Sequence, residues 1–204
     1  MIQPIVEGKG EIEAVPLLCR RFLDALGAYQ VKINRPIKRN RHQLIDHTEL
    51  SKSIEIALEQ PNCQAILILF DADGDCPKKV VENLKQKAID FSRGTPCEVV
   101  VACQEYESWF LASLESLRDK CGISPMASYD GEPELPRGAK SHLEQWMELG
   151  YSPPIDQAKL TAAFDMKTTY RKCRSFRRMV KAFGDLISKN GIVLPCWPPR
   201  DWVS

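Results

Sequence analysis

The segment Ala65-Ile66-Leu67-Ile68-Leu69-Phe70-Asp71-Ala72-Asp73 contains the clearest structural signal in the chain. Six consecutive apolar residues followed by acids and Gly74 are typical of a buried strand that ends abruptly in a loop. Because both faces of this strand are apolar, it is expected to lie in the middle of a parallel sheet.

Weaker patterns extend this interpretation in both directions. Apolar runs predict further strands, and residues spaced three or four apart predict the helices between and after them. The expected strands are 2–6, 31–33, 65–70 and 98–103, and the expected helices are 12–26, 50–58, 77–88, one starting at 104, 139–149, 156–164 and 175–188. Residues 122–138 are rich in Gly and Pro and predict a loop. We therefore expect an α/β domain over 1–121, with a mostly parallel sheet flanked by helices, and a helical region over 122–204 packed on it as one globular unit.

Composition restricts the class of protein. Of 204 residues, 44% are apolar and 27% are charged, which excludes a disordered, collagenous or coiled-coil chain. No apolar run approaches the roughly 20 residues that cross a bilayer, and the first residues lack a signal-peptide pattern, so we expect a cytoplasmic protein without a membrane span. The eight cysteines include no C-x-x-C pair, and we interpret them as reduced thiols rather than zinc ligands.

Charge is balanced overall but unevenly distributed. The chain has 28 basic and 27 acidic residues, yet residues 167–181 contain seven basic residues and no acid. These are Lys167, Arg171, Lys172, Arg174, Arg177, Arg178 and Lys181. The cluster is either a solvated basic face or a phosphate-binding surface for nucleic acid, and the sequence favours neither. The candidate phosphate-binding residues are Arg171, Arg174, Arg177, Arg178 and Lys181.

Acidic residues follow three of the expected strands. They are Glu7; then Asp71, Asp73 and Asp75; then Glu105 and Glu107. A single acid after a strand is usually a turn or cap residue, but parallel strands bring their carboxyl ends to one edge of the sheet. Carboxylates crowded there repel one another, and a divalent cation with hard oxygen ligands, Mg²⁺ or Mn²⁺, would relieve the repulsion. The set therefore predicts a metal site.

Two of these motifs resemble the Toprim fold, which topoisomerases, DnaG-type primases and OLD-family nucleases share. They are Val6-Glu7-Gly8 and Phe70-Asp71-Ala72-Asp73. The segments 105–111, 156–160 and 174–177 look like a small prokaryotic Toprim-like family of uncharacterised function, often encoded beside AAA-type ATPases in phage-defence or restriction loci.

The resemblance implies a function and roles for particular residues. Glu7 would transfer a proton or bind metal, Asp71 and Asp73 would bind metal, and Lys9 would hold a phosphate. Asp75 and Glu105 are further candidate ligands, and Glu107 is a further candidate catalytic residue. We expect a Mg²⁺- or Mn²⁺-dependent nuclease that acts on DNA or RNA with an AAA-type ATPase partner. The alternative is a non-catalytic Toprim-like partner of that ATPase, and homo-oligomerisation is left open.

Overall fold

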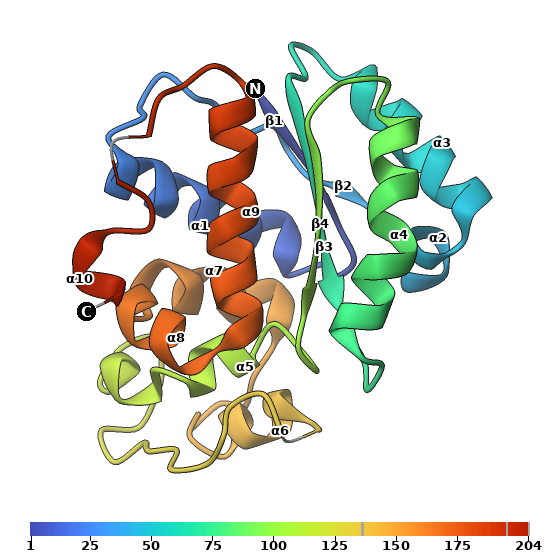
Figure 1. Cartoon of the computed structure of the whole chain (residues 1–204). Coiled ribbons are helices and arrows are strands. Elements are labelled where there is room, and N and C mark those ends of the chain that lie inside the picture. The colour runs from blue at the N-terminus through green and yellow to red at the C-terminus, as the bar shows by residue number, and fades with distance from the viewer. Residues whose placement is uncertain (136, 195, 204) are drawn as a thin grey trace.

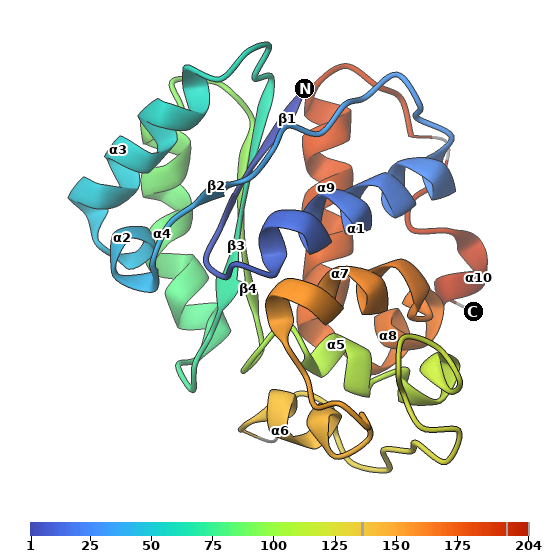
Figure 2. The ribbon, with the colours of Figure 1, turned by 180° about the vertical axis from the view of Figure 1, so that it is seen from behind.

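The computed structural model describes residues 1–135, 137–194 and 196–203. Its centre is a four-stranded, all-parallel sheet in the order β2-β1-β3-β4, formed by β1 (Ile2–Val6), β2 (Ile37–Lys38), β3 (Ala65–Asp71) and β4 (Cys97–Ala102). Helices cover both faces (Figure 1, Figure 2). The fold is thus the expected α/β class, and the arrangement is Rossmann-like.

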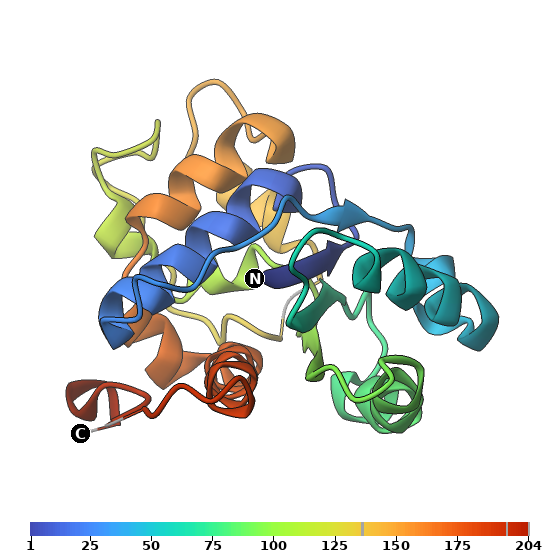
Figure 3. The same cartoon turned by 90° about the horizontal axis from the view of Figure 1, so that it is seen from above.

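The first half of the chain supplies the sheet and the helices of one face. α1 (Glu11–Leu26) follows β1, whereas α2 (Arg41–Ile45), α3 (His47–Leu58) and α4 (Pro77–Phe91) lie together on the opposite face. Figure 3 shows this two-sided arrangement from above. The chain leaves β1 toward β2 and leaves β3 toward β4, so the crossovers from the two central strands diverge. A crevice at the carboxyl ends of β1 and β3 is the usual ligand position in such sheets.

The second half is helical, as expected, and packs on the α1 face. It comprises α5 (Ser108–Leu111), a 3₁₀ helix η1 (Leu114–Leu117), α6 (Ala139–Glu144), α7 (Pro153–Ala163), α8 (Met166–Lys172), α9 (Arg174–Lys189) and α10 (Arg200–Val203). α7 packs on α1, and α9 packs on β4. One apolar core on this face runs from Ile2 to Trp202, so residues of both halves bury each other.

The β3 pattern is confirmed, since all seven residues of the strand are buried. Alternate residues enter different cores: Leu67 and Leu69 face α1 and α9, whereas Ile66, Ile68 and Phe70 face α3 and α4. The strand forms because its β-branched and aromatic side chains fill both faces of the pleat.

Three expected elements were placed wrongly. The strand over 31–33 is only a bridge from Ile33 to Ile2, and pairing resumes at Ile37–Lys38, because Pro36 has no N–H for the ladder. The helix expected from 104 begins at Ser108, and that expected over 139–149 ends at Glu144. The basic stretch spans two helices, α8 and α9, because Cys173 between them is extended. In the described ranges, no helix combines the length and hydropathy needed to cross a membrane.

Candidate functional site

Four acids meet at the carboxyl ends of three neighbouring strands. Glu7 follows β1, Asp71 ends β3, and Glu105 and Glu107 follow β4. Because β1, β3 and β4 are adjacent in the sheet, their ends bring these side chains to one place. Asp71 and Glu107 are almost fully buried, whereas Glu7 is half-buried. Together with Glu11, from the first turn of α1, these four acids form what we call the carboxylate cluster.

Lys140, at the start of α6, lies among these acids. Its Nζ is 3.9 Å from Asp71 Oδ2, 3.8 Å from Glu105 Oε1 and 3.9 Å from Glu107 Oε2. Its backbone N–H donates to Glu105 Oε2 at 2.9 Å, which fixes the start of α6 over the cluster. Burial opposes the charged ammonium, but the carboxylates outweigh burial and raise the pKa of Lys140. An internal cation thus offsets part of the negative charge.

Glu11 joins the cluster from the first turn of α1, although the sequence analysis did not single it out. Its Oε2 accepts the backbone N–H groups of Glu7 and Gly8 at 3.0 and 3.1 Å, which closes the turn between β1 and α1. Burial, with repulsion from Glu107 and Glu7, raises its pKa from 4.5 to about 7 despite those two hydrogen bonds. The signal that was available is the four-residue spacing of Glu7 and Glu11 in Glu-Gly-Lys-Gly-Glu.

Burial also raises the pKa of Asp71, Glu107 and Glu7. Burial raises the pKa of Asp71 well above its usual value, and Glu11 and Glu107 add to the rise. Burial likewise raises the pKa of Glu107, and it raises that of Glu7 together with the charge of Asp73. The cluster therefore holds protons near neutral pH more readily than isolated carboxylates do.

Two carboxylate oxygens in the cluster have unused hydrogen-bonding capacity. Glu107 Oε1 accepts from Tyr151 Oη at 2.8 Å and from Gln157 Nε2 at 3.4 Å, which orients the side chain. No described residue donates a hydrogen bond to its buried Oε2, which lies 3.9 Å from the Lys140 Nζ, or to the buried Oε2 of Glu7. Unpaired buried oxygens are costly, and a cation or a proton would satisfy them.

The loop after β3 is fastened beside the cluster by an arginine. The Arg41 guanidinium donates to the carbonyl of Asp71, to that of Ala72 at 3.0 Å and to Asp75 Oδ2 at 2.7 Å. Asp75 is therefore in an ion pair and its side chain is 65% exposed, so the structure does not bring it into the cluster. Arg41 instead holds the backbone that carries Asp71 and Asp73.

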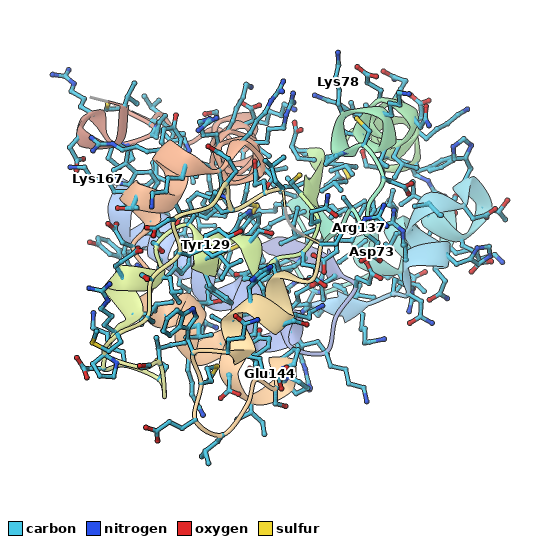
Figure 4. All side chains as sticks on the ribbon, turned by 90° about the horizontal axis from the view of Figure 1, so that it is seen from below. Asp73, Lys78, Tyr129, Arg137, Glu144 and Lys167 are labelled. Atoms are coloured by element: carbon cyan, nitrogen blue, oxygen red, sulfur yellow. The ribbon has the colours of Figure 1, made fainter. Side chains whose placement is uncertain are left out.

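Asp73 and Lys9 lie at the rim. Asp73 is exposed with φ of 49°, a left-handed conformation that Asp tolerates better than most residues, and its charge acts on Glu7. The Arg137 guanidinium lies against the neighbouring Gly74, and Figure 4 shows Asp73 and Arg137 close together at this end of the molecule. Lys9 is exposed in the turn between β1 and α1. Lys9 lies in the turn after β1, and Arg137 lies in space against the loop after β3.

The donor chemistry fits a hard divalent cation, but the geometry is not preformed. All members of the cluster offer carboxylate oxygens, which Mg²⁺ and Mn²⁺ prefer. Among the residues that the structure describes, no group of three or more His, Cys, Asp or Glu is arranged as a ready metal site. The acids are instead spaced around Lys140. A cation would bind Glu7, Asp71 and Glu107 after a side-chain rearrangement. Glu7 and Glu107 have the oxygens that accept no hydrogen bond from the described residues, and Asp71 lies beside them.

The basic candidates on α8 and α9 fall into two groups. Arg177 Nη1 donates to the carbonyls of Tyr170 and Arg171 at 3.0 and 2.9 Å and so caps the end of α8. Arg171 donates to the carbonyls of Trp202 and Asp201, which fastens α10. By contrast, Arg174, Arg178 and Lys181 are exposed on α9. These three remain available for a ligand.

Fold and site together define an α/β protein with a parallel sheet and a carboxylate cluster at the carboxyl ends of its strands. Residues 6–183 match the model of a family described as a domain of unknown function, DUF4276, and the chain belongs to this family. The match includes the whole carboxylate cluster, Lys140 and most of α9. No curated protein and no solved structure matches the chain.

Proposed function

We propose that the protein is a Toprim-like, metal-dependent nuclease that cleaves phosphodiester bonds of DNA or RNA in the cytoplasm. The observation that carries the proposal is the carboxylate cluster at the ends of three adjacent strands, in which buried oxygens of Glu7 and Glu107 accept no hydrogen bond from the described residues. Glu11, Asp71 and Glu107 are buried beside the half-buried Glu7 and Glu105. Crowding acids in this way is destabilising, and folded proteins retain such an arrangement where function requires it.

The proposed roles follow from position. Asp71 and Glu107 are oriented by hydrogen bonds from the Tyr106 N–H and the Tyr151 hydroxyl, which suits them to act as metal ligands. When bound, Mg²⁺ or Mn²⁺ supplies neutralising charge and Lewis acidity toward a phosphoryl oxygen. Glu7 is half-buried and its raised pKa suits it to accept a proton from an attacking water. Lys9 and Arg137 at the rim are placed to hold phosphate oxygens.

Lys140 has a proposed role both when the carboxylate cluster is free of metal and when it holds a cation. Without a cation its ammonium stabilises the buried acids. With one, the ammonium would move outward, where it can pair with a substrate phosphate, because its side chain is already 42% exposed. The start of α6 would then join the substrate-binding rim.

A cleavage assay tests this proposal. The full chain is incubated with labelled single-stranded DNA, duplex DNA and RNA in Mn²⁺, Mg²⁺ or EDTA, alone and with an ATPase from a neighbouring gene. We expect cleavage only with a divalent cation, and its loss in Glu7→Gln and Asp71→Asn. The matched control is Glu13→Gln, an exposed glutamate of α1. Cleavage that persists in EDTA and in Glu7→Gln would refute the mechanism.

The position of Lys140 also favours a second function, that of a non-catalytic partner protein. Because Lys140 already balances three carboxylates, the cluster can persist as a structural element in a non-catalytic partner of an AAA-type ATPase. In that case the chain and the ATPase co-elute on size-exclusion chromatography, Asp71→Asn alters co-elution, and every substrate remains uncleaved with metal and partner present.

A further inference from the structure

A groove on the outer side of α9 combines basic and aromatic groups. It has a volume of about 700 Å³, and its lining includes Tyr170, Arg174, Arg178, Lys181, Trp197 and Pro198. We call it the α9 groove. Its volume lies within the range of 300–1,000 Å³ typical of small-ligand sites. The groove is separate from the carboxylate cluster, and none of the cluster residues lines it.

The groove is built by the chain that follows α9. Trp197 returns to α9 and donates its Nε1–H to the Val180 carbonyl at 2.7 Å. Gly184 makes this approach possible, because a Cβ there would lie 2.3 Å from Trp197 Cδ1. A glycine inside a helix is unfavourable relative to alanine, and at Gly184 it leaves the room that the Trp197 ring occupies.

Positive charge lines one side of the groove. Arg174 and Arg178 are exposed, and in the described ranges their side chains have no ion pair. Lys181 Nζ forms an ion pair with Asp185 Oδ2 at 2.6 Å, but the Lys181 side chain is 75% exposed, and such exposed ion pairs contribute little free energy. Lys181 can therefore exchange this partner for a ligand. The charge therefore favours an anionic ligand.

Aromatic rings form the other side. Tyr170 and Trp197 are half-buried, and both line the groove with Pro198. Their inner sides are held by packing: Tyr170 contacts Trp202, and Trp197 contacts Phe22 and Trp202. Rings fixed in this way are suited to stack on a flat partner without losing further conformational freedom.

From this combination we infer that the α9 groove binds single-stranded nucleic acid, with phosphates on Arg174, Arg178 and Lys181 and a base against Tyr170 or Trp197. Basic grooves with aromatic platforms are the usual way to bind unpaired strands, whereas a duplex hides the faces of its bases. The inference rests on the proposed function, since it names the form of nucleic acid that the nuclease would take. α9 begins at Arg174, at the end of the molecule where the strands terminate (Figure 1).

Binding in EDTA tests the inference apart from cleavage. Fluorescence anisotropy is measured with a labelled oligothymidylate 12-mer and with a 12-base-pair duplex. We expect the single strand to bind at least about tenfold more tightly. Replacing Arg174, Arg178 and Lys181 with Gln should flatten the salt dependence of log K by up to about 2, near 0.7 for each lost contact. The matched control replaces Lys52, Lys87 and Arg93, exposed cations of the α3–α4 face, and should leave the slope unchanged.

The aromatic part is tested by Tyr170. Tyr170→Leu should weaken binding by about 5- to 150-fold with an unchanged salt slope, because stacking contributes about 1–3 kcal/mol per base. Tyr170→Phe keeps the ring and should bind like wild type, which separates stacking from misfolding. Duplex binding as tight as single-strand binding, or wild-type affinity in both the basic triple variant and Tyr170→Leu, would overturn the inference. Because binding is measured in EDTA, strand binding by a protein that cleaves no substrate would contradict the nuclease proposal and leave this inference standing.

Discussion

Replacing Lys140 with methionine should destabilise the folded protein by about 2 kcal/mol at pH 8. At about 4 Å and an effective dielectric constant near 20, each of its three charge pairs is worth about 4 kcal/mol before solvation is counted. The side chain is 42% exposed, so solvent screening and the recovered hydration of the ammonium cancel most of this attraction. The net stabilisation by Lys140 that remains, about 2 kcal/mol, is less than the 3–5 kcal/mol lost when a fully buried ion pair is broken.

The loss should depend on pH and on metal. Near pH 5 the buried acids hold more protons, because their pKa values are raised, so removing Lys140 should cost less than about 1 kcal/mol. Millimolar Mn²⁺ should restore stability at pH 8 and stabilise the variant more than wild type, because the cation no longer competes with an ammonium group.

Urea denaturation at pH 5 and pH 8, with and without MnCl₂, measures these effects. Lys52→Met is the matched control, since Lys52 forms an exposed pair with Glu49 and its loss should leave the stability nearly unchanged. The reasoning is refuted if Lys140→Met is as stable as wild type at pH 8, or if its loss of stability is the same at both pH values.

Three further perturbations test other parts of the site. The pKa of Glu11 is raised in the folded state, so the folded protein binds more protons there than the unfolded chain, and the contribution of Glu11 to stability falls as pH rises from 4.5 through about 7. Glu11→Gln should remove about 3 kcal/mol of that fall, as measured from urea midpoints at pH 5 and 8. Equal pH dependence of stability in the two proteins would disprove this. Gly10→Ala should destabilise by about 2–4 kcal/mol because its Cβ would lie 2.2 Å from Gln157 Oε1, and a thermal melt within a degree of wild type would contradict this. Arg41→Gln should lower the free energy of unfolding by about 1–3 kcal/mol, because it loses hydrogen bonds to the loop after β3. Asp75→Asn removes only an exposed charge and should lower it by less than about 1 kcal/mol. Equal losses of stability in chemical denaturation would argue against the role of Arg41.

The sheet was predictable where the pattern was strong. The run 65–70 is apolar on both faces, and only a central strand accommodates that, so its place followed from the sequence. β2 was not predictable, because it has two residues and its pairing is interrupted at Pro36. The start of α9 depends on Glu134, whose carboxylate accepts the N–H groups of Arg174 and Ser175. A contact across some forty residues of chain leaves no local signal.

The candidate site was predictable to the extent that it lies at strand ends. Glu7, Asp71, Glu105 and Glu107 follow strands, and parallel topology alone brings such residues together. The groups that orient and balance them come from the helical second half, at positions such as Lys140 and Tyr151. Which acids turn inward is also a tertiary property: Asp75 is drawn to Arg41, whereas Glu11, a helix residue by pattern, turns back toward β1.

The proposed nuclease function requires the carboxylate cluster to hold a divalent cation. Electron paramagnetic resonance of Mn²⁺ titrated into the metal-free protein measures this directly, because bound Mn²⁺ loses the six-line signal of the free ion. Asp71→Asn is the matched variant, since the amide oxygen can still accept the Tyr106 N–H bond that Asp71 Oδ1 accepts at 2.8 Å. The account predicts saturable binding to wild type that Asp71→Asn weakens at least about tenfold. Binding that is absent from wild type, or equal in the two proteins, would contradict it.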